Sequence, residues 1–74
     1  MAITKIDQCG NVATIFANGK VAASVLGKVI GKSSSGCVLE YNGLYTVYGD
    51  RGNVMTSVRA SDWARRKSEF SRYM

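Results

Sequence analysis

The chain has no histidine and no proline, and only two cysteines and five acidic residues occur among its 74 positions. Without histidine it lacks the commonest general base and the usual activator of serine and cysteine nucleophiles. The acids are scattered, so no spacing forces two carboxylates together as glycoside hydrolysis requires. We therefore predict a protein that binds a partner and does not act as an enzyme.

The two cysteines, Cys9 and Cys37, lie far apart in the sequence. Two distant thiols without histidine cannot form a tetrahedral zinc site by themselves. We expect no metal site and no cofactor. Reduced thiols are the main expectation for a cytosolic chain, and a disulfide between the two is the alternative.

Long apolar runs are absent as well. A bilayer-spanning helix needs roughly 18–20 apolar residues, whereas the longest nearly apolar run, Val21 to Ile30, is broken by Ser24, Gly27 and Lys28. The stretch from Met1 to Asp7 has no apolar block of the kind found in secretory signals. These features predict a cytoplasmic protein with no membrane partner.

Turn signals recur at short intervals along the chain. Asn18-Gly19 and Asn42-Gly43 suit tight hairpins in which both central residues have positive φ. A longer turn is expected at Asp50–Asn53 and a flexible loop at Ser33–Gly36. The runs between them are rich in β-branched and aromatic residues, which favours strands. We predict strands at Val12–Ala17, Lys20–Ile30, Cys37–Tyr41, Leu44–Tyr48 and Val54–Arg59, with an extra edge strand at Ile3–Asp7.

Two of these hairpins resemble each other. The segment Thr14–Val25 aligns with Thr46–Val58 when Arg51 is treated as one inserted residue. Both segments read Thr, aliphatic, aromatic, small, Asn or Asp and Gly, and both continue to Val and end in Ser-Val. A duplication and a chance likeness between two hairpins are both open, and both predict hairpins.

The pattern changes at Ser61, which can cap a helix, with Asp62 favourable at the positive end of its dipole. Trp63, Phe70 and Met74 recur at helical spacing, and Trp63 and Phe70 are the expected structural anchors. The predicted fold class is therefore α+β and β-rich. It consists of an antiparallel meander of about five strands over residues 1–59, as a curved sheet or a small partly open barrel, followed by one amphipathic helix over 60–74 in a single domain. Gly27 is expected to bend the long strand.

Ten Lys and Arg residues oppose five acids, giving a formal charge of +5, and residues 59–74 carry five cations and two acids, a net +3. Such an excess attracts polyanions, and exposed aromatics beside cations stack the bases of single strands. The leading hypothesis is a nucleic-acid-binding module, for single-stranded DNA or RNA or for the DNA backbone. Its expected contacts are Lys20, Lys28, Lys32, Arg51, Arg65, Arg66 and Arg72, with Tyr45 or Tyr48 stacking. Lysines that merely protect sheet edges and tyrosines in the core are the alternative reading.

The order of elements, a meander followed by one helix, resembles the Pur and Whirly types of single-strand-binding protein. That resemblance implies a curved sheet that meets nucleic acid and a helix that helps to form a homodimer. The layout also resembles the arm-binding domains of some phage integrases and small phage or plasmid inhibitors. The alternative is therefore a module that binds a host or phage protein, as an inhibitor of a host defence or nucleic-acid-processing complex or as a small assembly subunit. In that alternative Met55, Tyr45 and the helix would form an apolar patch with a basic rim.

Overall fold

The computed structural model describes residues 2–74 and contains seven strands followed by a short helical tail. The strands are β1 (Ile3–Cys9), β2 (Val12–Ala17), β3 (Lys20–Leu26), β4 (Lys28–Ser33), β5 (Gly36–Tyr41), β6 (Leu44–Gly49) and β7 (Val54–Arg59). They form two antiparallel sheets, a first sheet in the order β1-β2-β3 and a second sheet in the order β4-β5-β6-β7. The β-rich class with a C-terminal helix is confirmed. The single five-strand meander is wrong in detail, because seven strands divide into three and four.

Gly27 explains this division. The predicted strand Lys20–Ile30 is two strands, β3 and β4, that belong to different sheets and meet at Gly27. Gly27 has a φ of 139°, which L side chains rarely adopt, and a Cβ there would lie 3.2 Å from the Glu40 carbonyl oxygen. The chain therefore leaves the first sheet and enters the second at Gly27, because glycine tolerates both the positive φ and the close approach to the Glu40 carbonyl.

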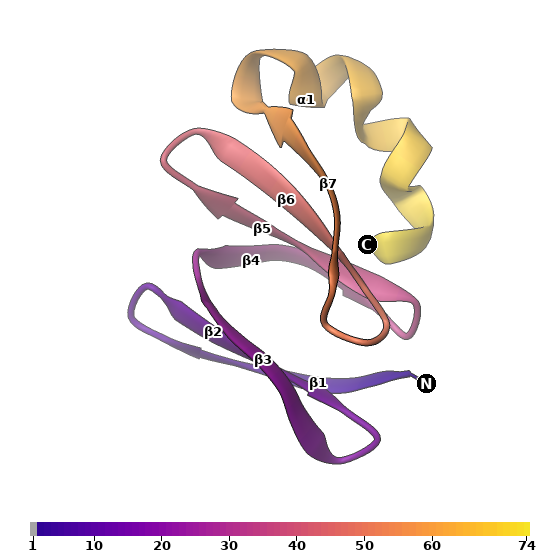
Figure 1. Cartoon of the computed structure of the whole chain (residues 1–74). Helices are drawn as coiled ribbons and strands as arrows, with labels where there is room; N and C mark the ends of the chain where they lie inside the picture. The colour runs from indigo at the N-terminus through magenta and orange to yellow at the C-terminus, as the bar shows by residue number, and fades with distance from the viewer. Residues whose placement is uncertain (1) are drawn as a thin grey trace.

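The molecule has three layers, the first sheet, the second sheet and the helical tail (Figure 1). Between the sheets, Ile3 and Ile15 from the first pack with Cys37, Leu39 and Tyr48 from the second. Between the second sheet and the tail lies another core, made of Val38, Val47, Val58, Trp63 and Phe70. Strand β5 contributes to both cores because its neighbouring side chains point to opposite faces.

The two similar sequence segments form hairpins with the same irregularity. In β2–β3, Ile15 pairs with Ala23 and Phe16 with Val21, so Ala22 is an extra residue. In β6–β7, Val47 pairs with Thr56 and Tyr48 with Val54, so Met55 is extra. The alignment of the two segments places Met55 opposite Ala22. The likeness therefore extends from residue types to the register and to the position of the β-bulge.

The first sheet has one covered and one uncovered face. Ala13 and Ile15 point into the inter-sheet core and are fully buried. By alternation and register, the opposite face, here called the outer face, is formed by Lys5, Asp7, Cys9, Val12, Thr14, Phe16, Val21, Ser24 and Leu26. Within residues 2–74 no element covers it, and Val21 and Leu26 are 61% and 55% exposed.

Strands β1 and β4 are neighbouring edges of the two sheets, and two groups of hydrogen bonds link them. At one end the Ile3 amide donates to the Ser34 carbonyl over 3.0 Å. At the other, the Gln8 side-chain amide donates to the Gly27 carbonyl over 2.9 Å, and its oxygen accepts from the Val29 amide over 3.0 Å. At this end, the Gln8 side chain makes the hydrogen bonds between the two edges that backbone groups make within a sheet.

The tail differs from the expected single helix. α1 (Ala60–Arg66) is followed by a 3-10 segment, η1 (Lys67–Tyr73), with non-helical dihedrals at Phe70. Ser61 does not cap the helix, because it is already the second helical residue. The helix begins at Ala60, and Arg59 occupies the cap position without a side-chain capping bond. No helix within residues 2–74 has the length and apolar character needed to cross a membrane.

Trp63 and Phe70 are each 8% exposed, and their rings are stacked with centroids 5.8 Å apart. The third residue of the expected stripe, Met74, is 41% exposed. Its side chain nevertheless lies against Gly31 of β4, where a Cβ would come within 2.9 Å of Met74 Cγ. The glycine therefore lets the end of the tail lie directly on the strand.

Candidate nucleic-acid interface

Two adjoining hollows lie where the β2–β3 and β6–β7 turns meet. One, of about 350 Å³, lies between the β6–β7 turn and the tail, and the other lies between that turn and the start of β3; Arg51 lines both. Lys20 lines the second and Arg72 the first. We call the surface formed by Lys20, Arg51 and Arg72 the basic end. The complete linings are Ser35, Gly49, Asp50, Arg51, Asn53, Met55, Arg72 and Tyr73 for the first hollow, and Ala17, Asn18, Lys20, Val21, Ala22 and Arg51 for the second.

Turn geometry brings Lys20 and Arg51 together. Asn18 and Gly19 both have positive φ, 54° and 77°, as the tight hairpin requires, and Lys20 follows directly as the first residue of β3. Gly52, next to Arg51, lies so close to β3 that a Cβ would be 3.0 Å from the Ala22 Cβ. The β6–β7 turn is therefore packed against the first half of β3, and the inserted residue Arg51 lines the same hollow as Lys20.

The tail brings Arg72 to the same place. The Ser33 hydroxyl donates a 2.5 Å hydrogen bond to the Arg72 carbonyl, which ties η1 to the end of β4. Tyr73 lies over Gly36, where a Cβ would come within 2.7 Å of its ring. The Arg72 guanidinium carbon is 5.2 Å from the Tyr73 ring centroid, within the range of a cation–π contact.

The charges of the basic end are largely unopposed. Within residues 2–74, Lys20, Arg51 and Arg72 form no ion pair. Asp50 lines the same hollow, so three cations and one acid leave a local charge of +2. Cations held near one another by packed turns meet an anionic chain without first breaking an internal salt bridge.

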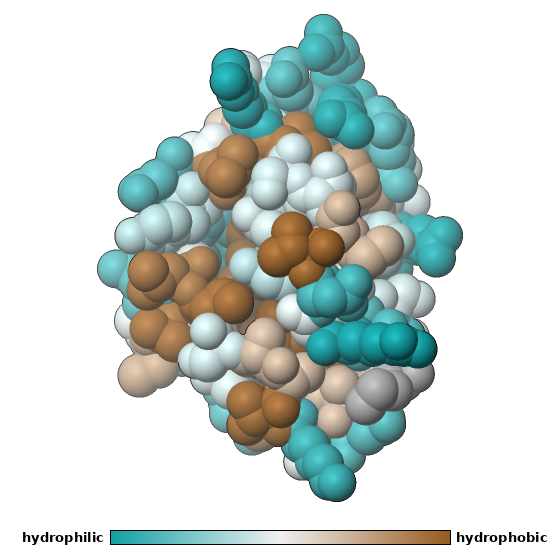
Figure 2. Space-filling model, viewed as in Figure 1, coloured by the Kyte–Doolittle hydropathy of each residue, from teal (hydrophilic) through white to brown (hydrophobic). Residues whose placement is uncertain are grey.

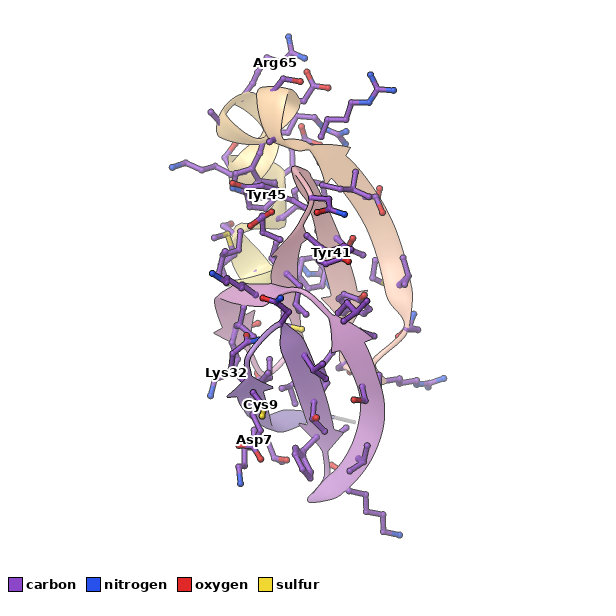
Figure 3. The ribbon with its side chains drawn as sticks, turned by 90° about the vertical axis from the view of Figure 1, so that its left-hand side faces the viewer. Asp7, Cys9, Lys32, Tyr41, Tyr45 and Arg65 are labelled. Atoms are coloured by element: carbon purple, nitrogen blue, oxygen red, sulfur yellow. The ribbon has the colours of Figure 1, made fainter. Side chains whose placement is uncertain are left out.

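The other predicted cations lie elsewhere. Arg65 pairs with Asp62 at 2.7 Å, and Arg66 pairs with Glu69 at 3.4 Å. Lys28 is exposed at the start of β4, in a separate hollow that Glu40 also lines. Figure 3 shows Arg65 at one end of the molecule and Lys32 far from it, on the side of the other half near Cys9. The predicted cations therefore do not form one continuous surface, because only three of the seven line the adjoining hollows.

The tyrosines also differ from expectation. Tyr48 is 8% exposed and packs in the inter-sheet core, so it offers no ring face for a base. Tyr45 is half-buried, with its ring centroid 4.8 Å from that of Trp63. Tyr41 has the exposed ring, at 43% exposure, whereas Tyr73 is half-buried like Tyr45 and lines the basic end. Sequence reasoning missed Tyr73, because its only signal was its position next to Arg72.

The cysteines differ strongly in their surroundings. Both are free thiols, with Cys9 exposed on the outer face and Cys37 buried in the inter-sheet core. Burial raises the pKa of the Cys37 thiol from 9.0 to about 11, so it stays protonated at neutral pH. In the part of the chain that the structure describes, no three metal-ligating side chains come together.

Comparison with known proteins gives no relative: no family model, no curated protein and no solved structure matches this chain.

Proposed function

We propose that the protein binds single-stranded nucleic acid through the basic end. The observation that carries the proposal is the meeting of Lys20, Arg51 and Arg72 around two hollows that share Arg51, with no internal ion pair among residues 2–74. Three side chains from three separate segments hold their charges around one stretch of surface. Such a surface suits successive phosphates of a flexible strand.

The chemistry of the lining supports a single strand. Tyr73 is half-buried and already pairs with the Arg72 guanidinium, so the exposed part of its ring and the cation together offer a stacking surface for a base. The exposed Asn18-Gly19 turn leaves room for a phosphate to approach its backbone, because no other heavy atom lies within 4 Å of the position of a Cβ at Gly19. Arg65 and Arg66 lie outside the basic end, and acids on the same helical tail pair with both.

Oligonucleotide binding to two variants of equal net charge tests the proposal. The triple variant Lys20→Ala, Arg51→Ala, Arg72→Ala removes the basic end and lowers the formal charge from +5 to +2. The control Lys28→Ala, Lys32→Ala, Arg65→Ala lowers it by the same three units at residues outside the basic end. Fluorescence anisotropy with a labelled single strand should show loss of binding for the first variant and retention for the second.

Salt dependence sharpens the result. Three phosphate contacts by a single strand should give a log–log slope of about −2, at roughly 0.7 per contact. No binding by the unaltered protein at about 50 mM salt would refute the proposal, since phosphate contacts are strongest at low salt. Equal weakening in both triple variants would also refute it, because net charge and not the basic end would then govern binding.

A protein target is a second candidate, favoured by one observation. Met55 is 52% exposed and lines the hollow beside Arg51 and Arg72, so an apolar side chain borders the cations. An acidic protein surface with an apolar centre would match this arrangement. A stoichiometric partner that survives nuclease treatment and is lost with Met55→Asp would favour this candidate over nucleic acid.

A further inference from the structure

We infer that the outer face of the first sheet is a self-association surface, on which a second copy of this chain packs sheet against sheet. The two sheets present four faces in all. Two of these face each other, and the helical tail covers a third. Within residues 2–74 the outer face is the one left uncovered, so two copies that pack by their sheets must both use it, around a two-fold axis.

The internal repeat shows what such a face does when it is covered. Phe16 on the outer face corresponds to Tyr48 in the second hairpin, and Val21 corresponds to Val54. Tyr48 is buried at 8% exposure, because its face packs on the first sheet. The equivalent face of the first hairpin has the same strand register and bulge, yet it lies open. A sheet is therefore an occupant of the right shape.

The charge distribution of the outer face is compatible with a second copy as the occupant. Two chains of formal charge +5 repel each other on most surfaces. The outer face carries one cation and one acid, Lys5 and Asp7, whose side chains are 3.4 Å apart, so its net charge is zero. Opposite charges side by side on one strand can exchange partners across a two-fold axis, which makes the border of the face self-complementary.

The apolar part of the face supplies the contact. Val12 and Leu26 pair across β2 and β3 and are 37% and 55% exposed. Figure 2 shows apolar side chains gathered on the part of the surface where the β1–β2 turn and the end of β3 lie in Figure 1. At the other end of the face, the Lys5 ammonium lies 5.4 Å from the Phe16 ring centroid. Phe16 itself is half-buried, so part of its ring is still open to contact.

The size of the face sets the expected strength. Three strands about 4.8 Å apart and about 20 Å long give a projected area near 300 Å². A standard interface buries roughly 800 Å² on each partner. The dimer should therefore be weak and should form at high protein concentration.

Sedimentation velocity over a concentration series tests the inference. The unaltered protein should pass from monomer to dimer, and Val21→Glu should raise the dissociation constant by more than about tenfold, because burying an unpaired charge at an interface is costly. Val54→Glu is the matched control, since Val54 is 60% exposed at the equivalent position of the other hairpin, away from the outer face. It should leave dimerisation unchanged.

A charge exchange separates this interface from others. Lys5→Glu puts two acids side by side on the face and should weaken the dimer, and Lys5→Glu with Asp7→Lys should restore it. A protein that stays monomeric at millimolar concentration would overturn the inference. So would a dimer that Val54→Glu disrupts and Val21→Glu leaves intact.

Cys9 provides a direct readout on the same face, because Cys37 is buried. A spin label on Cys9 should show dipolar coupling between copies in the unaltered protein and none in Val21→Glu. Dimers without coupling would place the contact elsewhere and overturn the inference. Val21 also lines the second hollow of the basic end, so Val21→Glu is not used to judge nucleic-acid binding. Lys5, Asp7 and Cys9 line neither hollow. The charge exchange and the Cys9 label therefore let self-association and nucleic-acid binding fail separately.

Discussion

The β2–β3 and β6–β7 hairpins share a register and a bulge, but they lie in different surroundings. The second hairpin is buried on both faces, with Tyr48 against the first sheet and Val47 against the tail. The first is buried on one face, with Ile15 in the inter-sheet core and Phe16 on the open side. The same local structure therefore acts as an inner layer in one case and as an outer layer in the other.

Removal of the Trp63 side chain should have the largest effect on this arrangement, because the tail covers the second hairpin through it. Trp63→Ala should lower the free energy of unfolding by about 3–5 kcal/mol. That is much of the roughly 4–11 kcal/mol expected for a chain of this length. Urea unfolding measures it, with Tyr41→Ala, at an exposed ring, as the control. Equal losses would show that the tail does not stabilise the sheet.

Truncation at equivalent positions tests the difference between the hairpins directly. Tyr48→Ala should cost about 3 kcal/mol, since it leaves a cavity between the sheets. Phe16→Ala should cost only about 1 kcal/mol in dilute solution, because the ring is half-exposed on the outer face. Thermal and urea unfolding give both values. Similar costs would contradict the assignment of one residue to the core and the other to the surface.

The buried thiol should make the inter-sheet core sensitive to alkali. The pKa of Cys37 is about 11 in the folded protein against 9.0 for the ordinary thiol, so the unfolded chain loses its proton first. Stability should be unaffected below pH 9 and should fall by about 2–3 kcal/mol as the pH rises to about 11. Burial, and secondarily the charge of Cys37, also raise the pKa of Tyr48, which acts in the same direction.

Two alanine variants separate these contributions. Cys37→Ala should remove the thiol's part of the alkaline loss, whereas Cys9→Ala, at an exposed site, should leave the pH profile unchanged. Unfolding curves at about pH 8 and pH 10.5 are sufficient for the comparison. An identical slope in all three proteins would show that Cys37 ionises as freely in the folded state as in the unfolded state.

A smaller effect is expected where the two sheets are joined. Gln8→Ala removes the bonds from its side chain to the Gly27 carbonyl and the Val29 amide and should cost about 1–2 kcal/mol. Hydrogen exchange should locate the change, with faster exchange at Val29. Unchanged exchange there would mean that backbone contacts alone hold β4 against β1.

Much of the local structure could be predicted from the sequence. The strands Val12–Ala17 and Val54–Arg59 match their predicted bounds, and Asn18 and Asn42 have the positive φ that their turns imply. These features depend on residues close together in the chain. The bend at Gly27 was also predicted, because glycine within a strand pattern marks a break.

The layering could not be predicted in the same way. Alternation indicates that neighbouring side chains point to opposite faces, but it does not say which layer covers each face. Tyr45 and Tyr48 were therefore equal candidates for the surface, although one packs against Trp63 and the other between the sheets. The basic end depends on contacts between distant segments, since Arg51 and Arg72 meet only through the packing of the tail.

The tail also fixes how far the stacking of layers can extend. The tail covers the Val47 face of the second sheet, which corresponds to the Ile15 face of the first sheet. Inside the molecule, the Ile15 face packs against the second sheet. If the tail were removed, each chain would expose the Val47 face of the second sheet on one side and the outer face of the first sheet on the other. These two faces of different chains could then pack together, as the Ile15 and Tyr48 faces do within one chain. Head-to-tail addition of further chains would then have no natural stop and would produce fibres. By covering the Val47 face, the short helical segment would stop such growth, as the end repeats of solenoid proteins do.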